Sequence, residues 1–93
     1  MRVEITNAYM RGYKKLPKHI KEEALTLVLE LARWPNLPNS RNLEKIGEDP
    51  SGDIYSARLD LHYRMLIVPQ KDCFCLRDIG THDELYARER KQR

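Results

Sequence analysis

Apolar residues recur along this chain with two spacings, and each spacing predicts a different kind of element. Val3 and Ile5 alternate with polar neighbours, which is typical of a short, half-buried strand. Asn7 can then cap a brief helix that runs to about Lys15. The apolar side of that helix consists of Tyr9, Met10 and Tyr13.

A second helix is predicted from about Pro17 to Arg33, because proline is favoured at the first position of a helix. Its core stripe has helical spacing and consists of Ile20, Ala24, Leu27, Val28 and Leu31. Leu25, Leu29 and Ala32 widen the stripe toward the first helix or toward a partner. Trp34-Pro35 ends the helix, and a long loop to about Asp53 follows, attached to the core through Leu43 and Ile46.

Three strands follow in quick succession, at about Ile54–Asp60, Tyr63–Pro69 and Cys73–Ile79. The connections between them are short enough for hairpins, so the strands are predicted to be antiparallel neighbours. The chain is therefore expected to form one α+β domain over residues 1–93. Its expected parts are an N-terminal strand, a two-helix hairpin on one face of an antiparallel sheet of about four strands, and a short C-terminal helix.

Composition adds modest limits. The net charge is +3 and the sequence pI is about 9.0, which favours anionic partners weakly. We find no apolar run long enough for a membrane span, and Met1-Arg2-Val3-Glu4 does not begin a signal peptide, so the cytoplasm is the expected location. Cys73 and Cys75 are too few for a zinc site, and they are expected to be small buried side chains. No metal or cofactor is expected.

The stretch LRDIGTHDELY, residues 76–86, suggests a site rather than a core. Thr81 and Glu84 have the spacing of a capping box, which places a helix start directly after a strand. His82 and Tyr86 are four residues apart, so they are expected on one face of that helix. Two side chains that can exchange protons would thus lie where the sheet gives way to a helix.

Alternation along the strands assigns the remaining side chains to faces. Tyr55, Ala57 and Leu59 share the side expected under the two helices, whereas Arg58 lies on the other side. In the next strand Arg64 is likewise expected on the face without helices. Arg58 and Arg64 would then lie near His82 and Tyr86, provided that the register is correct.

The order of these elements resembles the RelE/ParE superfamily of toxins from type II toxin–antitoxin systems, and most closely its RelE-like branch. The similar segments are Tyr13–Pro17, Leu43–Ile46, Ile54–Arg58, His62–Met65 and Asp78–Tyr86. The resemblance implies an endoribonuclease that cleaves mRNA, often in the ribosomal decoding site, and a cognate antitoxin that neutralises it. The alternative is a non-catalytic, ParE-like member that inhibits DNA gyrase or only binds its antitoxin.

The resemblance also implies roles for individual residues. Arg64, His82 and Tyr86 would be catalytic, and Arg58 and Lys45 would bind RNA phosphate. A second basic position of the family is Ser56 here, and His82 stands where one branch has arginine. Metal-independent cleavage by the 2′-hydroxyl needs a base, an acid and cations at the phosphate, which imidazole, phenol and guanidinium groups can provide. His82, at a helix N-terminus near these cations, is expected to be neutral and to act as the base or to assist Tyr86.

Each of these residues also has an ordinary structural alternative. His82 can be simply the first exposed residue of a capped helix, and Tyr86 can pack on the end of the sheet. Arg64 can pair with Asp60 or Asp78, and Arg58 can be a solvated strand residue.

Overall fold

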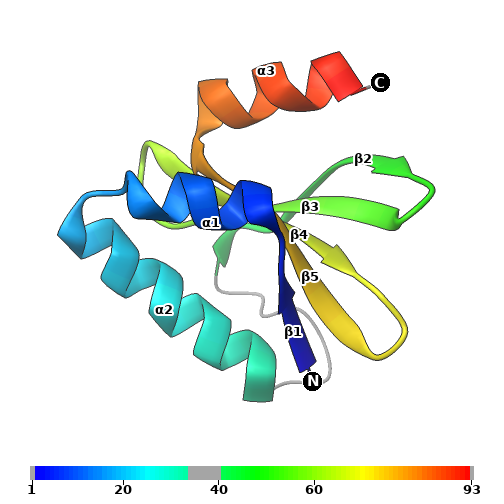
Figure 1. The fold of residues 1–93 in the computed structure, drawn as a ribbon, viewed down its shortest axis with the longest axis horizontal. Coiled ribbons are helices and arrows are strands. Elements are labelled where there is room, and N and C mark those ends of the chain that lie inside the picture. Colours follow the sequence, from blue (N-terminus) through cyan, green and yellow to red (C-terminus); the bar gives the residue numbers. More distant parts are fainter. Residues whose placement is uncertain (1, 34–40, 93) are drawn as a thin grey trace.

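The structure, a computed structural model, describes residues 2–33 and 41–92 (Figure 1). Its elements are, in chain order, β1 (Arg2–Ile5), α1 (Asn7–Lys14), α2 (Lys18–Arg33), β2 (Glu44–Asp49), β3 (Gly52–Arg58), β4 (Tyr63–Pro69), β5 (Cys73–Thr81) and α3 (His82–Gln92). The α+β architecture expected from the sequence is confirmed. Within the described ranges, no helix is long and apolar enough to cross a membrane.

The sheet has five strands in the order β1-β5-β4-β3-β2, and not about four. The β1 strand pairs with β5 in parallel, while the other neighbours are antiparallel, so the sheet is mixed. The additional strand, β2, replaces part of the predicted long loop. Its sequence EKIGED lacks apolar alternation because it is an edge strand with a bulge between Lys45 and Gly47. The side chains of Glu44, Lys45 and Glu48 are exposed.

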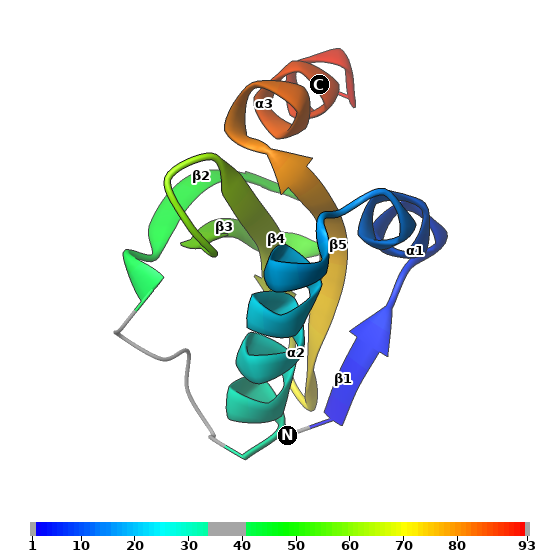
Figure 2. The same cartoon turned by 90° about the vertical axis from the view of Figure 1, so that its left-hand side faces the viewer.

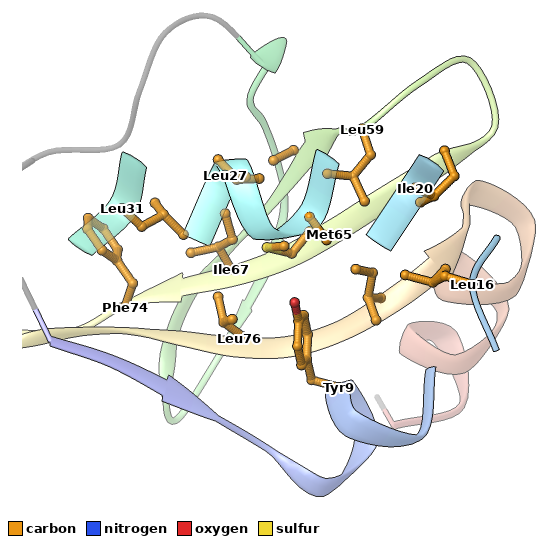
Figure 3. Close-up of a cluster of buried hydrophobic side chains, with 13 residues drawn as sticks. Tyr9, Leu16, Ile20, Leu27, Leu31, Leu59, Met65, Ile67, Phe74 and Leu76 are labelled. Atoms are coloured by element: carbon orange, nitrogen blue, oxygen red, sulfur yellow. The ribbon is translucent and has the colours of Figure 1, made fainter. Parts of the chain in front are cut away.

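One face of the sheet is covered by α1 and α2, as predicted (Figure 2). Figure 3 shows the side chains of α2 meeting those of β4 and β5 in the larger hydrophobic cluster. The predicted stripe is confirmed, because four of its members are fully buried: Ile20, Ala24, Leu27 and Leu31. The two arginines of β3 and β4 are absent from this cluster, in agreement with the predicted alternation.

Several details differ from the sequence predictions. Thr6, and not Asn7, caps α1, since the Thr6 side chain accepts a hydrogen bond from the backbone N–H of Tyr9. Ile5 is 52% exposed because β1 lies at the edge of the sheet. Leu25 and Leu29 are 50% and 61% exposed, so they do not pack against α1. The predicted helix end at Trp34-Pro35 lies outside the described residues.

The other face of the sheet is not bare, contrary to the sequence prediction. It carries a second cluster of four buried residues, to which α3 contributes one: Ile54, Leu66, Val68 and Leu85. Two further contacts hold α3 on the sheet. Glu89 accepts a hydrogen bond from Arg77 at 2.9 Å, and Arg88 donates to Asp78 at 2.8 and 3.2 Å.

Gly12 marks the closest approach of α1 to the sheet. A Cβ at this position would overlap the carbonyl oxygen of Ile79 in β5. Alanine normally stabilises a helix interior by about 1 kcal/mol relative to glycine. We expect Gly12→Ala to do the opposite and to lower the free energy of unfolding by about 1–3 kcal/mol. Chemical denaturation would measure the change, and Lys14→Ala, at an exposed position of the same helix, should be nearly neutral. A stabilised Gly12→Ala variant would show that α1 is not packed in this way.

Tyr9 makes the stability of the fold sensitive to strong base. Burial, and to a lesser degree the neighbouring Tyr13, raises the pKa of Tyr9 from 10.0 to about 12. The folded state therefore holds this proton more tightly than the unfolded state. The contribution is fully present below about pH 10 and is lost as the pH rises toward about 12. Thermal unfolding between pH 9 and 12 should show a smaller decline for Tyr9→Phe, and identical declines would contradict the assignment.

Candidate active site

Arg58 of β3 and Arg64 of β4 lie directly opposite each other in the sheet. One guanidinium nitrogen of Arg64, Nη1, donates to the hydroxyl of Ser56 at 3.4 Å. The Nε of Arg58 is buried without a hydrogen-bond partner among the described residues. Across the same part of the chain, neither arginine forms an ion pair. Two like charges facing each other across a strand pair are unfavourable by themselves, so this arrangement is suited to an anion.

The structural alternative for Arg64 is not observed. Asp78 binds Arg88 on α3. Asp60 instead accepts backbone hydrogen bonds from His62 and Tyr63, at 2.8 and 2.7 Å. Both carboxylates proposed as partners are therefore engaged elsewhere.

The N-terminus of α3 has the capping box that the sequence predicts. Thr81 Oγ1 accepts from the backbone N–H of Glu84 at 3.2 Å, and the Thr81 N–H donates to Glu84 Oε1 at 3.0 Å. These hydrogen bonds from the Thr81 backbone and hydroxyl hold the pKa of Glu84 below its usual range. They fix the direction in which α3 leaves β5, and so they place the residues that follow.

His82 and Tyr86 lie side by side on this helix, as predicted. Their rings stack with centroids 4.0 Å apart and an angle of 27° between the planes. The side chain of His82 is 47% exposed, and its Nδ1 lies 3.2 Å from a carboxylate oxygen of the fully exposed Asp83. The backbone N–H of His82 donates to the carbonyl of His62 at 3.0 Å, which ties the start of α3 to the turn between β3 and β4.

The hydroxyl of Tyr86 is buried and has no hydrogen-bond partner in the described part of the chain. The ring packs on the second hydrophobic cluster. In this conformation the Tyr86 hydroxyl does not reach solvent, whereas the imidazole stacked on the Tyr86 ring does. The geometry therefore favours His82 as the group that meets a substrate, and the predicted catalytic role of the Tyr86 hydroxyl stays a prediction.

The register of the sheet brings these groups to the same face. Arg64 is opposite Gly80, which directly precedes the cap residue Thr81. A Cβ at Gly80 would point at Glu84, Leu85 and Arg88, so this face of β4 and β5 is the face that α3 covers. Arg58, Arg64, His82 and Tyr86 accordingly share one side of the molecule, at the end of the sheet where α3 begins.

Lys45 is not brought to this group. In β2 it is opposite Tyr55, whereas Glu44 is opposite Ser56, the residue that contacts Arg64. Lys45 therefore belongs to the other face, where its Nζ lies 3.3 Å from Asp53 and 4.0 Å from Glu48. Its assignment to the phosphate-binding set stays a prediction, and the geometry gives it no place beside the other four residues.

A hollow of about 550 Å³ lies beside His82, and it is also lined by His62, Tyr63 and Thr81. His62 was assigned no functional role from the sequence. A second imidazole at the same hollow is a functional candidate that the sequence analysis missed. The signal was the pair His62–Tyr63 next to Arg64, but only the folded chain places this turn against the start of α3.

No protein-family model matches the chain, and no curated protein matches it. Solved structures do. RelE in the RelE–RelB complex of Pyrococcus horikoshii OT3 has a TM-score of 0.71 and 21% identity, and the match covers 86% of this chain and 92% of that one. The RelB–RelE complex of Methanococcus jannaschii gives a TM-score of 0.75 at 18% identity, with 91% and 96% covered. YoeB of Staphylococcus aureus has a TM-score of 0.71 and 16% identity, and the match covers 88% of this chain and 97% of that one.

The chain therefore has the fold of these RelE and YoeB structures, which agrees with the fold that the resemblance in sequence implied. Other similar structures include YafQ of Escherichia coli and a YoeB/ParE toxin of Agrobacterium tumefaciens. The sequence identities to these structures are all below 25%, so the similarity shows a shared fold and no more.

Proposed function

We propose that this protein is the toxin of a type II toxin–antitoxin system and that it cleaves mRNA without a metal ion. The observation that carries the proposal is the facing pair Arg58 and Arg64, two cations without a carboxylate partner among the described residues, on the face of the sheet that carries the exposed imidazole of His82. An RNA phosphodiester fits both features, because the guanidinium groups can bind its phosphate oxygens and the imidazole can accept a proton from the adjacent hydroxyl.

The proposed reaction uses the 2′-hydroxyl of the RNA as the nucleophile. His82 takes the proton of that hydroxyl, and the 2′-oxygen forms a bond to phosphorus. The bond from phosphorus to the 5′-oxygen breaks, and the leaving oxygen takes a proton from water at the exposed site. Arg64 and Arg58 hold the non-bridging oxygens as negative charge builds on them.

The proposal includes two partners. The structures of RelE from Pyrococcus horikoshii and from Methanococcus jannaschii contain RelE bound to RelB. We therefore propose that this chain also binds a cognate antitoxin. The second partner is the ribosome, which would present mRNA at the decoding site. The site of this small protein has few cations to orient an RNA strand. A ribosome that holds the mRNA in position would supply that orientation and so accelerate the reaction.

Induced expression tests the proposal directly. We expect growth arrest, rescue by co-expression of the antitoxin from the neighbouring reading frame, and cuts within translated regions in primer extension of cellular mRNA. Purified protein should cut mRNA bound to ribosomes faster than naked mRNA. Growth arrest with intact mRNA and inhibited gyrase would instead indicate the ParE-like alternative.

The buried hydroxyl of Tyr86 leads to a separate prediction. Tyr86→Phe keeps the ring that stacks on His82 and removes only an oxygen without a partner among the described residues. We expect this variant to keep mRNA cleavage within about 10-fold of the wild type, since a group that transfers a proton normally contributes about 10²–10⁴-fold. Tyr86→Ala, which removes the stack, should lose more. Primer extension after induction measures both, and a Tyr86→Phe variant as inactive as Tyr86→Ala would restore the phenol to a catalytic role.

A further inference from the structure

One short segment of this chain is strongly basic and contains no acidic residue. Residues 11–21 contain five Lys and Arg residues and no Asp or Glu. The rest of the chain then has 12 basic against 14 acidic residues, so the segment accounts for the whole positive excess. We call this segment the basic corner; its cations are Arg11, Lys14, Lys15, Lys18 and Lys21.

The basic corner lies where α1 ends and α2 begins. Four of its five cations are exposed, and Lys21 lies 5.7 Å from the centroid of the Tyr13 ring. None of the five forms an ion pair with a residue in the described ranges. By contrast, five of the other arginines and lysines have carboxylate partners: Arg2, Arg41, Lys45, Arg77 and Arg88. The basic corner thus leaves its charge available to an outside anion.

Two cations of the corner, Arg11 and Lys15, line a hollow of about 450 Å³ between α1, β5 and α3. The acidic groups in this hollow are already engaged, since Asp78 binds Arg88 and Glu84 binds Thr81. The charge of Lys15, together with that of Arg88, helps to lower the pKa of Glu84, which agrees with a position facing the start of α3.

This hollow and the hollow beside His82 share two lining residues, Tyr63 and Thr81, which are opposite each other in β4 and β5. A strand of nucleic acid that follows the surface past His82 would therefore continue over Arg11 and Lys15. Successive phosphates along an RNA strand form a row of charges, which a row of cations with few acids fits well.

We propose that the basic corner binds the phosphodiester backbone of RNA, with Arg11 and Lys15 holding phosphates next to the nucleotide at His82. The inference rests on the proposed function for the identity of the anion. The RNA can be the single strand that is cut or a structured RNA that presents it, and both have the same backbone chemistry.

The test measures RNA binding without cleavage. The probe is a fluorescent single strand of about 12 nucleotides with 2′-O-methyl groups, which removes the attacking hydroxyl. For the double variant Arg11→Gln/Lys15→Gln, we expect the Kd to rise about 10-fold near 0.15 M salt. The slope of log Kd against log salt should fall by about 1.4, corresponding to two lost phosphate contacts on a single strand.

Matched variants separate this site from net charge and from folding. Arg33→Gln/Lys71→Gln removes the same charge from exposed positions elsewhere, and it should change the Kd less than about 3-fold. Arg11→Lys/Lys15→Arg keeps both cations and should bind nearly as the wild type does. Equal losses for the two glutamine pairs, or no loss for either, would overturn the proposal.

Two further arms identify the partner. A hairpin RNA with the same modification shows whether the duplex or the single strand loses more affinity, and a loss on either supports the proposal. Unchanged RNA affinity together with weaker antitoxin binding would overturn it and assign the corner to the protein partner. If the corner binds RNA but induced cells keep intact mRNA, the proposed nuclease fails while this inference stands.

Discussion

Substitution of Arg64 by alanine is expected to lower mRNA cleavage by about 10²–10³-fold, which is the usual loss when one preorganised donor to a developing charge is removed. The reason is the position of Arg64, opposite Arg58 and opposite Gly80, with its Nη1 bound only weakly by Ser56. The folded state does not depend on its charge, because no described carboxylate pairs with it. Growth after induction and primer extension of cellular mRNA measure the loss.

Three comparisons make this prediction specific. His82→Ala should show a similar loss, because it removes the exposed proton acceptor. Arg64→Lys keeps the charge but loses the planar fork, so an intermediate activity is expected. Arg33→Ala, at an exposed position at the end of α2, should remain fully toxic. If Arg64→Ala and His82→Ala both folded and still cut mRNA at the wild-type rate, the candidate active site would be wrong.

The largest expected effect on stability concerns Arg77. This side chain joins three elements, because it contacts Glu89 of α3 at 2.9 Å and Asp49 of β2 at 2.7 Å. The Glu89 side chain is only 4% exposed. Arg77→Ala would leave that carboxylate buried without its cation. Breaking a buried pair in this way costs about 3–5 kcal/mol in the free energy of unfolding.

Arg2→Ala is the matched control, since the Arg2–Glu4 pair has a similar distance of 2.8 Å but side chains that are 66% and 50% exposed. Surface pairs of this kind contribute little to stability, because solvent screens the two charges. Urea denaturation of both variants measures the difference. Equal changes in stability would show that α3 does not depend on Arg77, and Glu89→Gln should fall between the two because it removes the buried charge.

The two helices and the three hairpin strands could be predicted because their apolar residues repeat clearly. The strand β2 could not be predicted, since an exposed edge strand such as EKIGED has no buried face to impose alternation. The parallel pairing of β1 with β5 was also missed, because the sequence of a short strand does not indicate which strand it pairs with. The second buried face was missed as well. Leu66 and Val68 lie on it, but the amphipathic pattern of α3 is too weak to identify the helix that covers them.

The candidate site divides in the same way. Period-two spacing placed Arg58 and Arg64 on the correct face, and the i, i+4 spacing placed the ring of His82 against that of Tyr86. The burial of the Tyr86 hydroxyl and the position of His62 depend on how α3 packs against the sheet. That packing is set by contacts between distant parts of the chain, which local sequence patterns do not show. The basic corner is visible in the sequence, but only the fold shows that it adjoins the hollow beside His82.

The pairing of β1 with β5 has a consequence for the synthesis of this protein. Thr6 donates a hydrogen bond to the carbonyl of Leu76, 70 residues further along the chain, and β1 finds its strand partners between Cys73 and Leu76. Such distant contacts form late, because a large loop must close before they contribute. During translation the nascent polypeptide should therefore stay incompletely folded until β5 has emerged from the exit tunnel.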